Sequence, residues 1–280
     1  MPEPVRLAGA VVDIAVPDRS RRMAGVSMAG FHGCADRPTE LALVPYPAFT
    51  VFIDFGDVWF VDDVRGVGER GSAVIGLGPA GVRGCGRAVD LLQIRLSPVV
   101  AHAALGGSSE SGGTVVALED LWGRDAGRIQ ERLHAAESWD ERFAIAAAAL
   151  TRRQAAGRPV DPEVAFAWAR ILLSRGRIRI DRLAAEIGWS YKRLWSRFRA
   201  QIGLTPKRAA QLVRFDYAVH RLAGGDSAAL VAAESGYTDQ SHLHRDVMNF
   251  AGVTPNGVAV APWLSVDDVA WVDPAYAAAV

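Results

Sequence analysis

The sequence predicts an α+β protein in which a β-rich half precedes an all-helical half. Residues 5–96 carry several short runs rich in Val, Ile, Phe and Trp, cut by Gly, Pro and Asp, which is typical of strands and turns. From about residue 160 onward, apolar residues recur at spacings of three and four, the period of amphipathic helices. Within that helical part, residues 188–206 and 236–255 align almost residue for residue, which indicates an internal duplication.

The first half reads as a β-rich domain. Its strand-length runs, the last of which is VDLLQIRLS at 89–97, favour a sandwich or a small cupin-like barrel. Ser97 is placed to cap a helix that has Pro98 at its first position and ends near Gly106 and Gly107. A surface loop is expected at 106–113, because its sequence is GGSSESGG.

Two further helices close this half, one from Gly123 to about His134 and one from Trp139 to Arg153. The polar segment 154–162, which contains one glycine and two prolines, is the expected linker. A chain of 280 residues, half of them hydrophobic, can bury two cores. We therefore expect domains at 1–155 and 160–262, followed by a tail at 263–280 for which the sequence gives no role.

The helical half reads as two short helical pairs joined by a longer helix. Asp161, Pro162 and Glu163 are expected to cap a helix that runs to about Arg175. The first pair is then Asp181–Ile187 and Ser190–Gln201, separated by Gly188. A helix at Lys207–Leu222 follows, with Leu212, Phe215, Val219 and Leu222 turned inward.

The second pair begins with a helix at Ser227–Ser235, in which Leu230, Val231 and Ala233 are expected to face inward. Gly236 breaks the chain, and Thr238 or Asp239 caps the next helix, which ends at Gly252. Its apolar stripe consists of Leu243, Val247 and Phe250, and Leu194 and Phe198 are the corresponding residues in the first pair.

The polar side of this last helix is rich in hydrogen-bonding groups. Gln240, Ser241, His242, His244 and Arg245 fall mostly off the apolar stripe. A helix packed along one side and polar on the other suits insertion into a DNA major groove. An ordinary helical hairpin would show the same periodicity, and the duplicated pair is what favours a tandem helix-turn-helix arrangement.

Charge is unevenly distributed along the chain. The net charge is zero, which alone favours neither presence nor absence of a nucleic-acid partner. The segment 175–214, however, holds eleven Lys and Arg residues against two acids, Asp181 and Glu186. A basic block on the segment that carries a helix-turn-helix motif indicates phosphate contact, whereas isolated arginines would indicate a solvated surface.

The tandem pattern resembles the C-terminal DNA-binding domain of the AraC/XylS family of transcription regulators, most clearly in GYTDQSHLHRD at 236–246. The resemblance covers roughly Val160 to Val260, and the order of elements in the first half resembles the family's N-terminal regulatory domains. It implies a sequence-specific transcription regulator whose partner is double-stranded DNA. It also implies a first domain that senses a small-molecule effector or mediates homodimerisation, with RNA polymerase as a further partner.

Two departures from the family pattern concern the second helix of each pair. The family commonly places arginine two residues after the packing leucine, and this sequence has Arg245 in the second pair but Ser196 in the first. Arg197 follows one residue later, about 100° further around the helix, which favours a phosphate contact over a base contact. The packing aromatic Phe198 is replaced by Val247 in the second pair, so a less tightly packed second motif is expected.

These considerations give a set of candidate DNA contacts. The residues expected at base edges are Lys192, Trp195, Ser196, Gln240, Ser241, His242, His244 and Arg245. The residues expected at the DNA backbone are Ser190, Arg193, Arg197, Lys207 and Thr238.

Other chemistries find little support in the sequence. The segment IGLGPAG at 75–81 has the spelling of a dinucleotide-binding turn, but Pro79 and the strand expected next favour a plain turn. His242 and His244 would point about 200° apart on a helix, so they cannot share a metal ion. His32, His102 and His134 are scattered through the first half, and Cys34 and Cys85 have no partners at metal-ligand spacing.

No enzyme activity, cofactor or metal is therefore expected. The competing hypothesis is a catalytic or metal-binding first domain fused to a DNA-binding anchor, and a third is constitutive DNA binding without a ligand. The sequence shows no leader pattern and no apolar run of about 18 residues, so a cytoplasmic protein without a membrane partner is expected.

Overall fold

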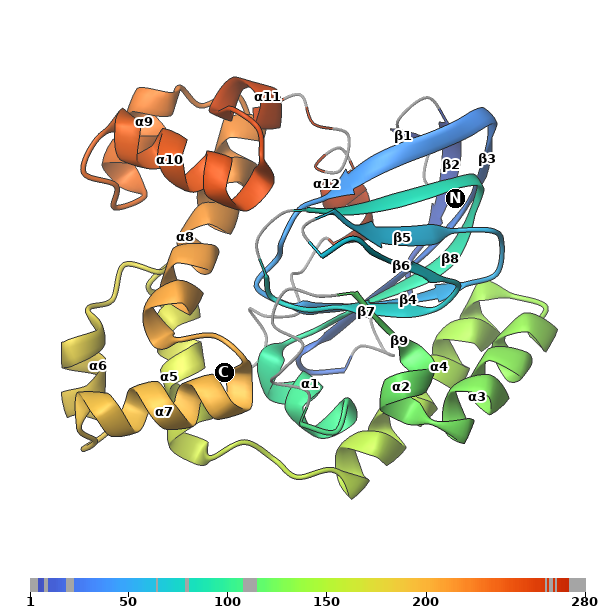
Figure 1. Ribbon diagram of the computed structural model, residues 1–280, viewed down its shortest axis with the longest axis horizontal. Coiled ribbons are helices and arrows are strands. Elements are labelled where there is room, and N and C mark those ends of the chain that lie inside the picture. Colours follow the sequence, from blue (N-terminus) through green and yellow to red (C-terminus); the bar gives the residue numbers. More distant parts are fainter. Residues whose placement is uncertain are drawn as a thin grey trace.

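The computed structural model describes residues 5–7, 10–18, 23–63, 65–78, 81–107, 115–259, 261, 264 and 266–271. Its strands all lie before residue 118, and an uninterrupted series of helices follows. Figure 1 shows the strands and the first helices on one side of the molecule and the later helices on the other, with α8 running along the second group. The predicted α+β architecture is confirmed.

Nine antiparallel strands form one sheet in the order β1-β2-β3-β8-β4-β7-β9, and β5 joins it by pairing with β6 and β8. The strands are β1 (Val5–Leu7), β2 (Ala10–Ala15), β3 (Val26–Leu43), β4 (Phe49–Asp54), β5 (Trp59–Asp62), β6 (Val67–Arg70), β7 (Ala73–Ile75), β8 (Val82–Leu96) and β9 (Val115–Ala117).

Alternation along β8 decides what lies on each face of the sheet. Leu92, Ile94 and Leu96 are fully buried and belong to the cluster beneath the helices, whereas Leu91 belongs to a separate cluster inside the sheet. Successive strand residues point to opposite faces, so Gln93 and Arg95 share the inner face with Leu91. They line a cavity together with side chains of β3, β4 and β5, which gives the sheet a barrel-like curl.

Four helices, α1 (Pro98–Ala104), α2 (Leu118–Trp122), α3 (Arg124–Ala135) and α4 (Trp139–Ala156), complete this half (Figure 1). Ser97 caps α1 by accepting from the Val100 N–H, and Pro98 is its first residue, as predicted. α4 extends to Ala156, beyond the predicted end at Arg153, because no breaker occurs before Gly157.

The link between the halves is therefore shorter than predicted and spans residues 157–161. Gly157 lies so close to α1 that an added Cβ would sit 2.1 Å from the Ala103 carbonyl oxygen. At the other end, the backbone N–H of Asp161 donates to the side-chain oxygen of Gln201 at 2.7 Å. Both ends of the link are thus attached to other elements.

The helical half contains α5 (Pro162–Leu173), α6 (Ile180–Glu186), α7 (Tyr191–Ile202), α8 (Pro206–Ala223), α9 (Ala228–Glu234), α10 (Gln240–Ala251), α11 (Pro255–Ala259) and α12 (Asp267–Ala270). The helix predicted from Asp161 to about Arg175 is present as α5, with Asp161 as its N-cap residue and Leu173 as its last residue. The side chain of Asp161, however, makes no capping hydrogen bond, because its carboxylate accepts from Arg197 instead.

The core of the helical half follows the predicted stripes except in α9. Leu212, Phe215, Val219 and Leu222 of α8 are buried. In α9, however, the buried residues are Val231 and Ala232, whereas Leu230 is 43% exposed and Ala233 is exposed. The prediction for Leu230 and Ala233 was wrong because a helix of seven residues spans only two turns, too few to fix its buried side by periodicity.

Some predicted segments lie wholly or partly outside the described residues. The loop at 106–113 is described only at Gly106 and Gly107, and the turn at 75–81 lacks Pro79 and Ala80. The element that follows this turn is the strand β8, so no helix begins there to hold a dinucleotide. The tail is described at residues 264 and 266–271, and the domain division at 155–160 stays a prediction.

Candidate nucleic-acid interface

The helical pairs α6–α7 and α9–α10 repeat one local structure. Gly188 and Gly236 end the first helix of each pair with φ of 70° and 78°, values that favour glycine. The next backbone N–H, of Trp189 in one pair and of Tyr237 in the other, donates back into the first helix at 2.9 and 3.1 Å. The two turns therefore repeat the same hydrogen bond, as the duplication inferred from the sequence predicts.

The second helix of each pair is capped at both ends. Ser190 accepts from the Arg193 N–H at 3.2 Å, and Asp239 accepts from the His242 N–H at 2.7 Å. Left-handed glycines, Gly203 and Gly252, end α7 and α10. Of the two predicted caps of α10, Asp239 is the one used. Thr238 lies between Tyr237 and the cap residue Asp239. The first pair has no equivalent of Thr238, because its cap residue Ser190 follows Trp189 directly.

The apolar stripes of both helices are buried. Leu194, Phe198 and Ile202 of α7 are fully buried, and so are Leu243, Val247 and Phe250 of α10. The ring of Phe250 stacks on Phe215 of α8 with centroids 4.9 Å apart. This contact supplies aromatic packing to the second pair, where Val247 replaces Phe198.

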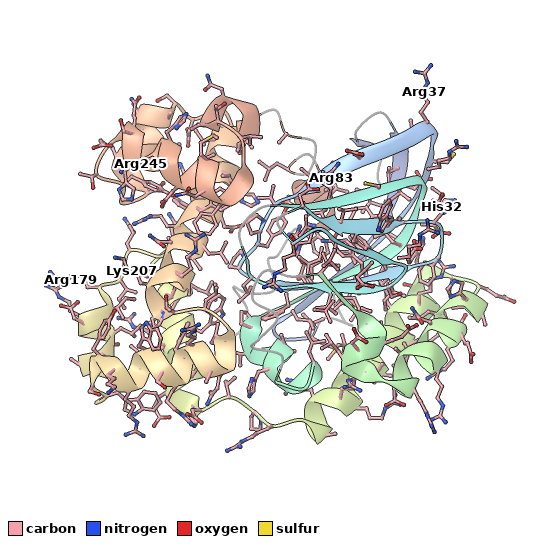
Figure 2. The ribbon with its side chains drawn as sticks, in the orientation of Figure 1. His32, Arg37, Arg83, Arg179, Lys207 and Arg245 are labelled. Atoms are coloured by element: carbon pink, nitrogen blue, oxygen red, sulfur yellow. The ribbon has the colours of Figure 1, made fainter. Side chains whose placement is uncertain are left out.

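The opposite sides of α7 and α10 face solvent. The exposed residues are Lys192, Trp195 and Ser196 on α7, and Gln240, Ser241, His244 and Arg245 on α10. In Figure 2, Arg245, Lys207 and Arg179 lie along the edge of the molecule opposite the strands. Seven of the eight predicted base contacts are therefore accessible, and Lys207 of the predicted backbone contacts is exposed as well.

The eighth predicted base contact, His242, packs mainly against residues of the turn that precedes α10. Its ring packs edge-on against Tyr237 with centroids 5.2 Å apart, and Nδ1 lies 3.4 Å from both the backbone nitrogen and the hydroxyl of Thr238. Arg193 occupies the same place in the first pair, with its guanidinium 4.4 Å from the centre of the Trp189 ring. Both residues therefore stabilise the turn, and neither prediction anticipated that role.

Arg197 is held by an acid from another helix. Its Nε and one terminal nitrogen donate to the Asp161 carboxylate at 2.8 and 2.9 Å. Partial burial would raise the pKa of Asp161, but the hydrogen bonds from Arg197 and Gln201 outweigh it and lower that pKa. A phosphate that contacts Arg197 would have to share it with Asp161.

The basic segment 175–214 is only partly available to a polyanion. Arg214 pairs with Asp246 in the interior, and Arg208 lies over the Phe250 ring at 3.9 Å, where burial lowers its pKa. Arg199, by contrast, is exposed and lies 5.2 Å from the Trp195 ring centre on the outer side of α7. The i,i+4 spacing of Trp195 and Arg199 could have revealed this pair in the sequence.

A second feature, which we call the sheet cavity, lies inside the curled strands. It measures about 130 Å³, and its apolar lining includes Phe31, Phe52 and Phe60. Tyr46, Arg95 and Val266 also line it. None of these lining residues was predicted as a site from the sequence, although the alternation of VDLLQIRLS places Arg95 on the face of Leu91.

Among the residues that the structure describes, no cluster of three or more His, Cys, Asp or Glu side chains could hold a metal ion. His32 is paired with Asp90 at 3.5 Å, and His134 Nδ1 donates to the Gln130 carbonyl oxygen at 2.9 Å, so these histidines serve local contacts. Of the helices described, none has the length and apolarity needed to cross a lipid bilayer.

Two matched helix-turn-helix pairs joined by one long helix, next to a β-rich half, define a DNA-binding protein of the tandem helix-turn-helix class. Residues 183–259 match the family described as a helix-turn-helix domain, and this domain is of the AraC type. The chain is thus a DNA-binding transcription regulator. No curated protein gives a significant match to the sequence.

A solved structure shares the fold at low sequence identity. ToxT from Vibrio cholerae O395 is 10% identical, with a TM-score of 0.50 over 86% of this chain and 98% of that chain. ToxT bound to (E)-4-(8-methylnaphthalen-1-yl)but-3-enoic acid is 9% identical, with a TM-score of 0.48 over 92% and 99%. The AraC-like transcriptional activator CuxR is 15% identical, with a TM-score of 0.26 over 72% and 90%.

Proposed function

We propose that this regulator recognises a specific DNA site by placing α7 and α10 in successive major grooves of one duplex. The observation that carries the proposal is the pair of capped helices with buried apolar stripes and exposed polar sides, both packed on α8. α8 has 18 residues and is therefore about 27 Å long. One turn of DNA is about 34 Å, so a spacer of this length suits two adjacent grooves.

Base recognition falls to the exposed residues of the two helices. Arg245 has the side chain best suited to a guanine edge, and Gln240 has the one best suited to adenine. In the free protein the Nε of Arg245 donates to the Ser241 carbonyl at 3.2 Å, so it must turn outward on binding. On α7, Lys192 and Trp195 contact the base edges, and Ser196 adds a smaller contact.

Backbone contacts supply affinity that does not depend on sequence. Lys207, in the first turn of α8, is exposed and suited to a phosphate. Arg193 and Arg197 of α7 add positive charge. Ser190 and Thr238 lie at the starts of the two second helices, where backbone N–H groups attract anions.

A binding-site selection from a random duplex library tests this proposal directly. We expect the full chain to enrich a motif with two conserved parts about 10 base pairs apart, one for each helix. Enrichment of a single part, or of no motif, would show that the two helices do not bind together. The same selection with the Arg245→Ala variant assigns one of the two parts to α10.

We further infer that the sheet cavity holds a small, largely apolar effector. Its volume of about 130 Å³ is close to that of apolar protein cavities that bind benzene, about 150 Å³. Extraction and mass spectrometry of the purified protein would identify a bound molecule, and Phe52→Trp, which fills the cavity, should reduce its recovery. Recovery unchanged by Phe52→Trp would place the molecule elsewhere. Dimerisation and contact with RNA polymerase stay predictions.

A further inference from the structure

We propose that the described residues of the tail, Leu264 and Val266–Trp271, form an intramolecular latch, in which the carboxylate of Asp267 ties the end of α8 to the rim of the sheet cavity. This inference rests on the proposed function, because it assigns the regulatory coupling between the cavity and the DNA-binding half. In Figure 1, α12 lies against the strands, on the side of the sheet that faces α8 and α11.

Asp267 is held by three side chains that come from three different parts of the chain. The Tyr46 hydroxyl lies 2.9 and 3.1 Å from its two oxygens, and a terminal nitrogen of Arg95 on β8 donates at 3.1 Å. His220 Nε2, in the last turns of α8, lies 2.9 Å from the same carboxylate. The carboxylate is thus a single joint between the sheet and the helix that carries both motifs.

The joint is buried and charged. The Asp267 and Arg95 side chains are 5% and 6% exposed. Burial raises the pKa of Asp267, but Arg95 and His220 outweigh it and lower that pKa, so the carboxylate is ionised. The Arg95 guanidinium is also stacked between the rings of Tyr46 and Trp271, at 3.5 and 4.0 Å.

Apolar packing holds the rest of the segment in place. Val266, Ala270 and Trp271 are buried in the same cluster as Phe52 and Phe60 of the sheet interior. Leu264 belongs to the other cluster, which includes the α8 and α10 core. The segment therefore contacts both apolar cores, in addition to the polar contacts that Asp267 makes with Tyr46, Arg95 and His220.

The anchors of the latch are also walls of the sheet cavity. Tyr46, Arg95 and Val266 line it, so an occupant that moves any of them changes the environment of Asp267. Removing one partner from a buried ion pair leaves an uncompensated charge, which makes partial opening unfavourable. The segment is thus suited to two discrete states, closed as observed here or released, rather than to gradual loosening.

Amide hydrogen exchange of the full chain without DNA tests the latch independently of DNA recognition. Asp267→Asn, which keeps the size but removes the charge, should speed exchange at residues 266–271 and 216–223 about tenfold. Asp120→Asn, a matched change at an exposed carboxylate on α2, should leave both segments unchanged. If Asp267→Asn does not fold, His220→Gln, at a side chain 36% exposed, should give the same pattern more weakly.

Affinity for the selected two-part duplex then tests the coupling. We expect Asp267→Asn to change this affinity at least threefold in either direction relative to Asp120→Asn. Exchange rates equal to those of the wild type would overturn the latch itself. Faster exchange with unchanged DNA affinity would overturn its regulatory role, while absence of any selected motif would count against the proposed function and leave the exchange result standing.

Discussion

Asp246 of α10 accepts a hydrogen bond from Arg214 of α8 at 2.9 Å, with the two side chains only 9% and 14% exposed. Asp246 occupies the position in the second pair that Arg197 occupies in the first. Both positions form ion pairs with a neighbouring helix, Arg197 with Asp161 and Asp246 with Arg214. The same position on the second helix of each pair thus forms an ion pair that orients this helix. The position is basic in the first pair and acidic in the second.

This pair makes a stability prediction. Asp246→Asn should lower the free energy of unfolding by about 3–5 kcal/mol, because it leaves Arg214 buried without its counter-charge. Urea unfolding followed by circular dichroism measures the change. The exposed-site variant Asp120→Asn should stay within about 0.5 kcal/mol of the wild type. A loss below 1 kcal/mol for Asp246→Asn would mean that the pair is solvated in solution.

Arg245 makes a prediction about sequence preference. Arg245→Ala should cost about 1–3 kcal/mol of binding to the best site and relax the preference at one or two base pairs. Binding-site selection with the variant measures both effects. Asn249→Ala, an exposed change later on α10, serves as the control. An unchanged selected motif would exclude Arg245 from base recognition.

Lys207 makes a different prediction, because a phosphate contact carries no sequence information. Lys207→Ala should weaken binding to specific and unrelated duplexes by the same factor and reduce the slope of log K against log salt by about 1. Titrations at several salt concentrations measure this slope. A loss confined to the specific duplex would instead place Lys207 at a base.

His220 makes a prediction about pH. Burial lowers the pKa of His220, but the hydrogen bond to Asp267 and the charge of Asp216 outweigh it and raise the pKa to about 9 from 6.5. Because the folded value is raised, the stabilisation is complete below pH 6.5 and disappears as the pH rises through about 9. Tyr46 and Arg95 complete the set of polar groups that face this carboxylate.

The expected observation is therefore a difference in melting temperature between the wild type and His220→Gln that is largest near pH 6 and vanishes near pH 10. The lowered pKa of Asp267 adds a second loss at the acidic end, below its ordinary value of 3.8. A difference that is the same at pH 6 and pH 10 would show that His220 is neutral in the folded protein.

Local rules predicted much of the helical half. Ser190, Asp239, Gly203 and Gly252 delimit α7 and α10 as their residue types require, since caps and left-handed glycines depend on a few neighbouring residues. The apolar run at 89–97 likewise predicted a strand, which is the end of β8, but not what either of its faces would contact.

The contacts that local rules could not supply join residues distant in the sequence. Arg197 meets Asp161 across 36 residues, and Arg95 meets Asp267 across 172. A charged residue on a helix gives no sign of whether a distant acid will reach it. The sequence therefore predicts neither the ion pair of Arg197 with Asp161 nor a role for the tail. His242 also contacts the inserted Thr238 in its own turn, and the first pair has no residue that would have indicated this contact.

Gly157 has a consequence for how the two halves can move. Its α-carbon lies against the Ala103 carbonyl of α1, and Gln201 of α7 holds the far end of the same short connection. A five-residue connection fastened at both ends cannot serve as a free hinge. Any swing of the helical half must therefore pivot at the α1–α7 contact, so motion would be largest at the opposite end, where α10 lies.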